Sequence, residues 1–239
     1  MASFIKLKQT PIKEIIFTIS FKENIDDTKL ELFSKMPLID DVFPIRNSGF
    51  NTHVQALNNQ PPKAKVSLDG FILRSEKPYK KILQARKGSL SLHIVNNYES
   101  FDSIIVELKK YWDLLIQCCK SLTVNNLAVR YLNFIEFKEN DLIEDLITIN
   151  TKHPFGKNIE NAFTQHKFAY DKNPLISINV VSTIGKNETK NGIILDILLN
   201  KKIENNGDFG FNNFGDMREA KNDIFYKSIT ELTINRYNQ

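Results

Sequence analysis

Residues 100–122 read SFDSIIVELKKYWDLLIQCCKSL, and their apolar side chains recur at steps of three and four residues. This period puts the apolar side chains on one side of a helix and the charged ones on the other. The stretch therefore predicts a long helix that buries one stripe against the rest of the chain. Cys118 and Cys119 fall inside it, and adjacent helical cysteines point apart, so we expect one core thiol, one flanking thiol and no disulfide.

Alternating apolar and polar residues predict strands on both sides of this helix. In the first half the expected strands span residues 14–21, 51–57, 63–75 and 81–96, with a bulge or turn at Gly88. In the second half they span residues 127–137, 166–170, 175–183 and 192–200. Short helices are expected from Asp26 or Asp27 and from Asp141, and segments 37–50, 151–163 and 205–215 are expected to be irregular. A last helix is expected from Asp216, and its inward-facing side chains are expected to be Ala220, Ile224, Phe225, Ile229 and Leu232.

Both halves of the chain thus have the same order of elements: strand, short helix, several antiparallel strands, long helix. We expect an α+β protein with one domain over residues 1–239, built from two like halves, 1–124 and 125–239. The halves are expected to pool their strands in one curved antiparallel sheet, covered by the two long helices. This order resembles the duplicated TATA-binding-protein type of fold, a likeness of topology that does not fix function.

The composition is that of a globular protein, with 41% hydrophobic and 25% charged residues. No apolar run approaches the roughly 18 residues that span a membrane, so we expect no membrane partner. The opening residues MASFIK alternate apolar and polar side chains and lack the apolar core of a secretion signal. We therefore expect a cytoplasmic protein, and two adjacent cysteines fit a reducing compartment.

The sequence lacks the recognisable motifs of metal binding and catalysis. Its four histidines, His53, His93, His153 and His166, are far apart, and no H-x-x-x-H or C-x-x-C pair occurs. No G-x-S-x-G elbow is present, and the glycines of residues 207–215 have the wrong spacing for a nucleotide loop. We expect this stretch to be a flexible surface loop. We also expect no catalytic residue, no metal site and no cofactor, with spatially assembled carboxylates, Asp196 among them, as the remaining route to an enzyme.

Positive charge is concentrated in residues 63–87, although the net charge of the whole chain is only +4. Asp69 and Glu76 alone oppose the eight cations of this segment, which are Lys63, Lys65, Arg74, Lys77, Lys80, Lys81, Arg86 and Lys87. With Phe71 and Tyr79 between them, these cations suit single-stranded nucleic acid, which binds through phosphate contacts and base stacking. A solvated hairpin protected by edge lysines is the alternative, and an acidic protein surface fits the same cations.

Three motifs resemble a sporadically distributed bacterial protein family of about this length that has no assigned activity. They are PIKEIIF at residues 11–17, LAVRYLNFI at residues 127–135 and FYKSITE at residues 225–231. The Gly that usually precedes the Arg-Tyr strand of this family is not evident here. The patchy distribution of the family implies a place in mobile or defence-type bacterial gene clusters.

The second motif contains the remaining candidate residues. Arg130 shares a strand face with Leu132 and Phe134, and an arginine buried among apolar side chains needs a carboxylate partner. We expect that partner to be Glu14. The pair joins the two halves in one interpretation, whereas in the other Arg130 and Asn133 line a recognition pocket.

The leading hypothesis is a non-catalytic binding or regulatory protein that acts through a macromolecular partner, in the first place another protein. The alternatives are a nucleic-acid-binding protein that uses residues 63–87 and an enzyme with assembled carboxylates. Binding through phosphates predicts an affinity that falls with salt, because each contact releases counterions.

Overall fold

The computed structural model describes residues 7–55, 63–78, 80–96, 98–149, 162–205, 207 and 209–239, without the side chains of residues 53–55 and 63–65. The strands are β1 (Ile12–Phe21), β2 (Ile45–Gln55), β3 (Lys63–Arg74), β4 (Lys81–Arg86), β5 (Ser89–Val95), β6 (Val124–Glu136), β7 (Phe163–Tyr170), β8 (Asn173–Asn187) and β9 (Lys190–Lys202). The helices are α1 (Asp27–Ser34), α2 (Pro37–Asp40), α3 (Phe101–Cys119), α4 (Ile143–Leu146), α5 (Asn213–Ser228) and α6 (Glu231–Tyr237).

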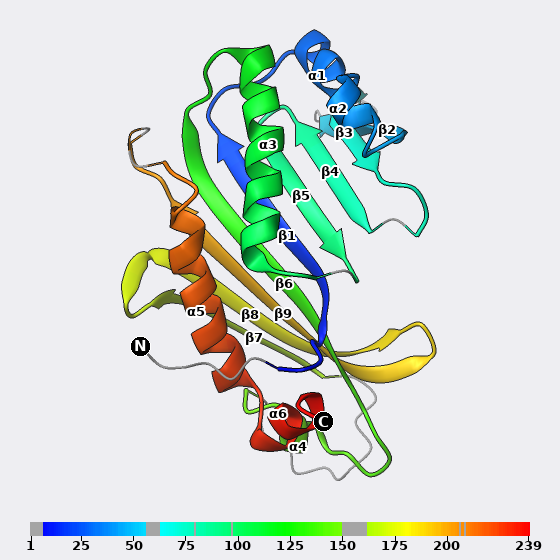
Figure 1. The fold of residues 1–239 in the computed structure, drawn as a ribbon, viewed down its shortest axis with the longest axis vertical. Coiled ribbons are helices and arrows are strands. Elements are labelled where there is room, and N and C mark those ends of the chain that lie inside the picture. Colours follow the sequence, from blue (N-terminus) through cyan, green and yellow to red (C-terminus); the bar gives the residue numbers. More distant parts are fainter. Residues whose placement is uncertain are drawn as a thin grey trace.

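The strands form one antiparallel sheet in the order β2-β3-β4-β5-β1-β6-β9-β8-β7 (Figure 1). β1 and β6 pair at its centre, with Ile15 opposite Tyr131 and Phe17 opposite Val129. The expected α+β class and the single antiparallel sheet are therefore confirmed.

The core lies on one face of this sheet, called here the core face. Ile15, Phe17 and Ile19 alternate along β1 and are fully buried, as expected when one face of a strand is covered. The ring of Phe17 lies 5.4 Å from that of Phe101 in α3 and 5.5 Å from that of Phe214 in α5. Both long helices thus pack on the core side of β1, and the opposite side is called the outer face.

Local signals fix where the first-half helices begin. Asp26 caps α1 by accepting a hydrogen bond from the Lys29 amide at 2.9 Å, and Ser100 caps α3 from the Ser103 amide at 3.1 Å. Each cap satisfies an amide that has no partner within its helix, which stabilises the helix by about 1 kcal/mol. The start of α1, after Asp26, and the long helix after Ser100 agree with the sequence-based prediction.

Several predicted boundaries are wrong. Residues 37–50 contain α2, with Pro37 in its first turn, and the start of β2 at Ile45. The stretch expected as one strand over residues 81–96 is the hairpin of β4 and β5, and its turn lies at Gly88, where a bulge or turn was expected. The last helix is broken at Ile229, which forms a β-bridge with Ile147. Leu232 therefore lies in α6 and is 47% exposed, although it was expected to point inward.

Two further expectations differ from the structure, and one falls outside it. Cys118 and Cys119 are both free and both half-buried, so neither is a fully buried core thiol. The Gly-rich stretch contributes Phe209 and Phe211, which pack against the core through Trp112 and Phe214. Residues 151–161, expected to be irregular, lie outside the described part. Across the described ranges, no helix has both the length and the apolar character needed to cross a membrane.

Candidate functional site

Arg130 lies on the outer face, because its neighbours Val129 and Tyr131 are buried on the core face. Its side chain is 44% exposed, so the expected burial among apolar residues is wrong. Nε donates to Asp196 Oδ1 at 2.9 Å and Nη2 donates to Oδ2 at 2.6 Å. Asp196 is a satisfied structural carboxylate in this fork, a geometry that arginine forms readily with carboxylates.

The expected partner Glu14 bonds instead to Nδ1 of His93 at 2.7 Å. Glu14 and Asp196 both lie opposite Leu132, on the two strands that flank β6. Both carboxylates therefore lie diagonally across from Arg130, and Asp196 takes the direct bonds. Glu14 and Asp196 can both be identified in the sequence as candidate carboxylates, but the sequence does not show that β9 lies beside β6.

Three cations of the basic segment pair with carboxylates, two of which come from elsewhere in the chain. Arg86 pairs with Asp69 at 3.0 Å, within the segment. The other two pairs are Lys81 with Glu107 of α3 at 2.8 Å and Lys87 with Asp27 of α1 at 2.9 Å. The sequence count therefore overstates the free positive charge of the segment.

Among its described residues, the rest of the segment offers no exposed aromatic side chain on which a base could stack. Phe71 is only 9% exposed, and Tyr79 lies outside the described residues. The side chains of Lys63 and Lys65 also lie outside them. Arg74 is half-buried on the outer face, and Lys77 and Lys80 are exposed. Among the described side chains of the segment, those that could contact nucleic acid are therefore cations, which would bind phosphates.

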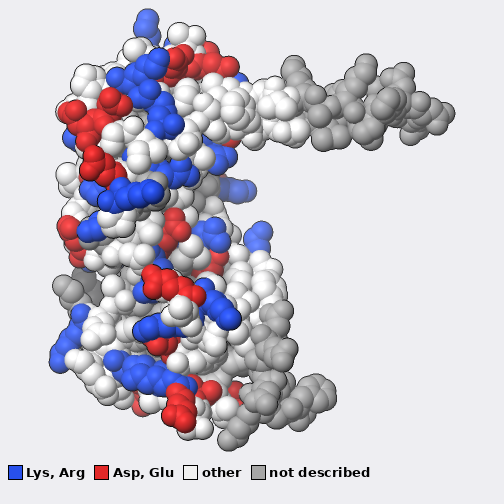
Figure 2. All heavy atoms as spheres, turned by 90° about the vertical axis from the view of Figure 1, so that its right-hand side faces the viewer, with Lys and Arg blue, Asp and Glu red and all other residues white. Residues whose placement is uncertain are grey.

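The β2–β3 hairpin extends beyond the sheet that carries it. β3 pairs with β4 only from Gly70 to Arg74, so residues 50–55 and 63–68 form a two-stranded ribbon, called here the arm. Figure 2 shows the arm projecting from the upper part of the body, which is hollowed below it. Phe50 and Val66 of the arm are 62% and 61% exposed, and the sequence of the arm also contains Lys63 and Lys65.

Gly70 makes the base of the arm possible. A Cβ at this position would lie 2.1 Å from the backbone oxygen of Ala85 and 2.7 Å from Cα of Arg86. Those atoms belong to the paired strand β4 and cannot move aside without breaking the sheet. Only glycine allows β3 to approach β4 this closely.

A second feature is a cleft of about 470 Å³ on the core side. The cleft is bounded by the segment before β1, the segment before α3, the end of β6, and helix α5. Its volume is typical of small-molecule sites. Its polar lining includes Lys8, Tyr98, Asn133, Arg218 and Lys221. Asn133 is buried and donates a hydrogen bond to the backbone oxygen of Leu195 at 3.0 Å. Asn133 and Arg130 therefore lie on opposite faces of β6 and do not line one pocket.

Lys221 is the unusual side chain of the cleft. Its Nζ lies 4.6 Å from the ring centre of Tyr131, a cation–π contact, and no described carboxylate is within ion-pair distance. Burial, with a smaller effect of the nearby Arg218 charge, lowers the pKa of Lys221 to about 8. The hydroxyl of Tyr131 is buried and has no hydrogen-bond partner within the described part of the chain.

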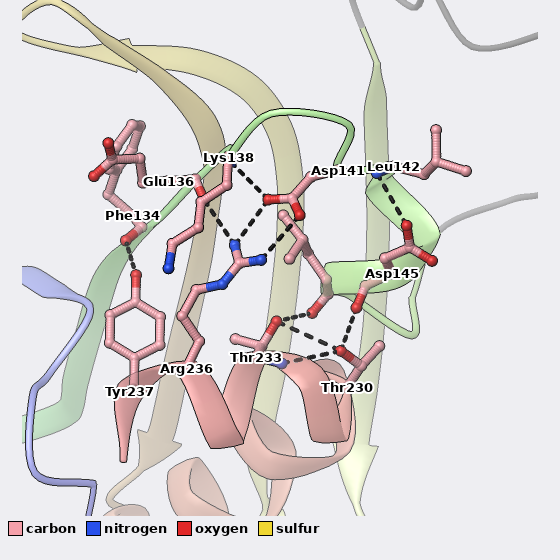
Figure 3. Close-up of polar contacts among 11 residues, drawn as sticks. Phe134, Glu136, Lys138, Asp141, Leu142, Asp145, Thr230, Thr233, Arg236 and Tyr237 are labelled. Carbon is pink, nitrogen blue, oxygen red and sulfur yellow. Dashed lines mark hydrogen bonds and ion pairs between the residues drawn. The ribbon is translucent and has the colours of Figure 1, made fainter. Parts of the chain in front are cut away.

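Polar contacts hold the C-terminal helix α6 against the end of β6 and the chain that follows it (Figure 3). Arg236 donates to both carboxylate oxygens of Asp141, at 2.8 and 2.9 Å, and to the backbone oxygen of Glu136 at 3.2 Å. The hydroxyl of Tyr237 donates to the backbone oxygen of Phe134 at 3.1 Å, as Figure 3 shows. The backbone oxygen of Tyr237 accepts from the Gln9 amide at 2.9 Å, so α6 ties the segment before β1 to the end of β6.

The closing motif, FYKSITE, makes the turn that allows this arrangement. The Thr148 amide donates to the Ser228 oxygen at 3.0 Å, and the Thr230 amide donates to the Leu146 oxygen at 3.1 Å. These bonds stop α5 and start α6 against the chain around α4. The motif therefore has a structural role in this protein.

Sequence reasoning missed Lys221, Arg218 and Tyr98. Lys221 follows the buried Ala220 and comes four residues after the buried Met217, so a cation at the border of the apolar stripe of α5 was the available signal. Lysines are common at such borders because their stems cover apolar surface, which makes that signal weak. Among the described residues no group of three or more His, Cys, Asp or Glu side chains is placed to hold a metal ion.

Comparisons with known proteins add little to this geometry. No protein-family model and no curated protein matches the chain. A solved structure that matches is described as the di-domain ARO/CYC StfQ from the steffimycin biosynthetic pathway. It is 6% identical, the match covers 94% of this chain and 96% of that chain, and the TM-score is 0.21. A score this low supports no conclusion about fold or function.

Proposed function

We propose that this chain is a non-catalytic binding or regulatory protein that acts through a protein partner, with the arm as the docking element. The observation that carries the proposal is the exposure of Phe50 and Val66 on a ribbon that extends beyond its sheet. Two-stranded ribbons are marginally stable alone, and exposed apolar side chains favour burial in a partner. β2 is also the terminal strand of the sheet, so its outer edge offers backbone groups to an added strand.

The proposal extends to the architecture. In each half the last strand returns beside the first, β5 beside β1 and β9 beside β6, and a long helix follows. This order supports one domain of two like halves, residues 1–124 and 125–239, with α3 and α5 covering one face of the shared sheet. We further propose membership of the sporadic bacterial family, a cytoplasmic location and a role in a mobile or defence-type gene cluster.

The test is a pull-down of the tagged full-length protein from its host, with and without nuclease treatment. We expect a stoichiometric protein that survives nuclease and is lost from the double variant Phe50→Asp, Val66→Asp. Val106→Asp is the matched control, because Val106 is an apolar side chain on α3 that is 71% exposed. It should retain the partner, since exposed substitutions outside the interface leave binding intact.

Two outcomes would contradict the arm proposal. Retention of the partner by the double variant would place the interface elsewhere. Recovery of nucleic acid that is lost on nuclease treatment and on changing Arg74 and Arg86 to Glu would favour nucleic-acid binding by the basic segment. The latter complex should weaken steeply with salt.

A further inference from the structure

The cleft beside α5 is separate from the arm and independent of its proposed role. We propose that this cleft binds a small organic anion, a carboxylate or a phosphate on an aromatic or aliphatic body, with Lys221 as the counter-charge. The proposal is based on the chemistry of the cleft lining. A test of it does not depend on whether a protein docks at the arm.

The charges of the cleft favour an anion. An ammonium withdrawn from water is costly unless a negative charge or hydrogen-bond acceptors compensate it. Lys221 has the ring of Tyr131 beneath it and no described carboxylate at ion-pair distance. Arg218, on the same helix, pairs weakly with the exposed Asp102 at 3.4 Å and lies over the ring of Phe101. Lys8 adds a third cation to the lining, while Glu99 is its one carboxylate among the described residues.

The remainder of the lining suits an apolar body. It includes four aromatic side chains, Tyr98, Phe101, Phe225 and Tyr226, together with Pro11 and Ile12. Ligand sites commonly combine such walls with a few polar groups that fix orientation. Tyr131, whose ring contacts Lys221, also has a buried hydroxyl with no hydrogen-bond partner among the described residues.

A cation is a poor occupant, because Lys8, Arg218 and Lys221 would repel it. A folded macromolecule is a poor occupant as well, because the space is about 470 Å³. A small anion matches both the sign of the charge and the volume.

The experiment is isothermal titration of the full chain at pH 7 with benzoate and with phenyl phosphate, and with benzamide as the neutral probe of the same shape. We expect saturable binding of at least one anion and affinity at least about tenfold lower for benzamide. Tighter binding of benzoate would indicate a carboxylate ligand, and tighter binding of phenyl phosphate would indicate a phosphate ligand. Lys221→Met should lose about tenfold in anion affinity, since it removes the charge and keeps the length.

Lys227→Met is the matched control, because Lys227 is an exposed lysine on the same helix that pairs with Asp223. It should bind both anions as the unchanged protein does. Absence of saturable binding by both anions, equal binding of benzamide, or unchanged affinity in Lys221→Met would each overturn the proposal. Circular dichroism of each variant separates loss of binding from loss of fold.

The pH dependence gives a second readout on the unchanged protein. Anion affinity should fall as the pH rises through about 8, because Lys221 loses its proton there. The other titratable groups that line or underlie the cleft among the described residues are Lys8, Tyr98, Glu99, Tyr131, Arg218 and Tyr226, and burial raises the pKa of Tyr226. Burial raises the pKa of Tyr98 and that of Tyr131, so neither hydroxyl ionises at this pH. Affinity that stays constant from pH 7 to 9 would contradict the role of Lys221.

Discussion

Arg130 of β6 and Lys221 of α5 lie on opposite sides of the sheet, and their surroundings differ sharply. Arg130 is on the outer face, nearly half exposed, and forms a two-point pair with Asp196. Lys221 is on the core side against the ring of Tyr131, the residue next to Arg130 in sequence. Within the described residues it has no carboxylate partner. The more exposed cation is thus paired, whereas the less exposed one is not.

The difference separates structural charges from candidate binding charges. A paired arginine at the surface satisfies its own hydrogen bonds and leaves little to gain from a ligand. An unpaired ammonium near the interior lowers the stability of the folded chain, and an anionic ligand would remove that cost. The motif containing Arg130 drew attention in the sequence, but its arginine is already satisfied.

The largest expected effect comes from breaking the α6 contact with the chain that follows β6. Arg236→Ala removes the ion-pair partner of Asp141, which is 10% exposed and keeps only the Lys138 amide as a donor among the described residues, and should destabilise the fold by about 2–4 kcal/mol. The hydrogen bond from Arg236 holds the pKa of Asp141 below 3.8, so the contribution is present above that pH and lost as pH falls further. Urea unfolding measures it.

Arg86→Ala is the control for that variant, because its pair with Asp69 joins neighbouring strands at the more exposed base of the arm. Its cost should be no more than about 1 kcal/mol. Equal losses in the two variants would show that the α6 contact is no stronger than an ordinary surface pair.

The second effect has the opposite sign. Lys221→Met should stabilise the fold by about 1–3 kcal/mol at pH 7, because it removes a desolvated charge and keeps the packing of the stem. The folded pKa of about 8 lies below the ordinary 10.5, so the unfolded chain binds more protons between these values. Stability of the unchanged protein should therefore rise from pH 8 to 10.5, and this rise should be absent in the variant. A destabilised variant would mean that the cation is satisfied by a contact outside the described residues.

The smallest effect is expected on the outer face. Asp196→Ala removes the partner of Arg130, but a guanidinium that is 44% exposed is readily hydrated. The loss should be about 0.5–1 kcal/mol and should shrink in high salt. A loss of more than about 2 kcal/mol would show that the outer face is covered in solution, and it would remove the contrast with Lys221.

The regular elements were predictable because their signals are local. The period of residues 100–122 and the caps at Asp26 and Ser100 depend on neighbours within a few residues. The break of the last helix at Ile229 was not predictable, because it depends on a bridge to Ile147, 82 residues earlier. The partner of Arg130 was missed for the same reason, since β9 follows β6 only after two other strands.

The sequence by itself determined the class of the fold, the long helix, the central strands and the absence of recognisable catalytic motifs. The tertiary structure decided which charges remain unpaired, because Asp27 and Glu107 neutralise lysines of the basic segment from distant positions. It also brought together helix α5, the segment before β1 and the segment before α3 as the walls of one cleft. Periodicity reports the face on which a side chain lies, but pairing and enclosure depend on strand order, which short-range patterns do not encode.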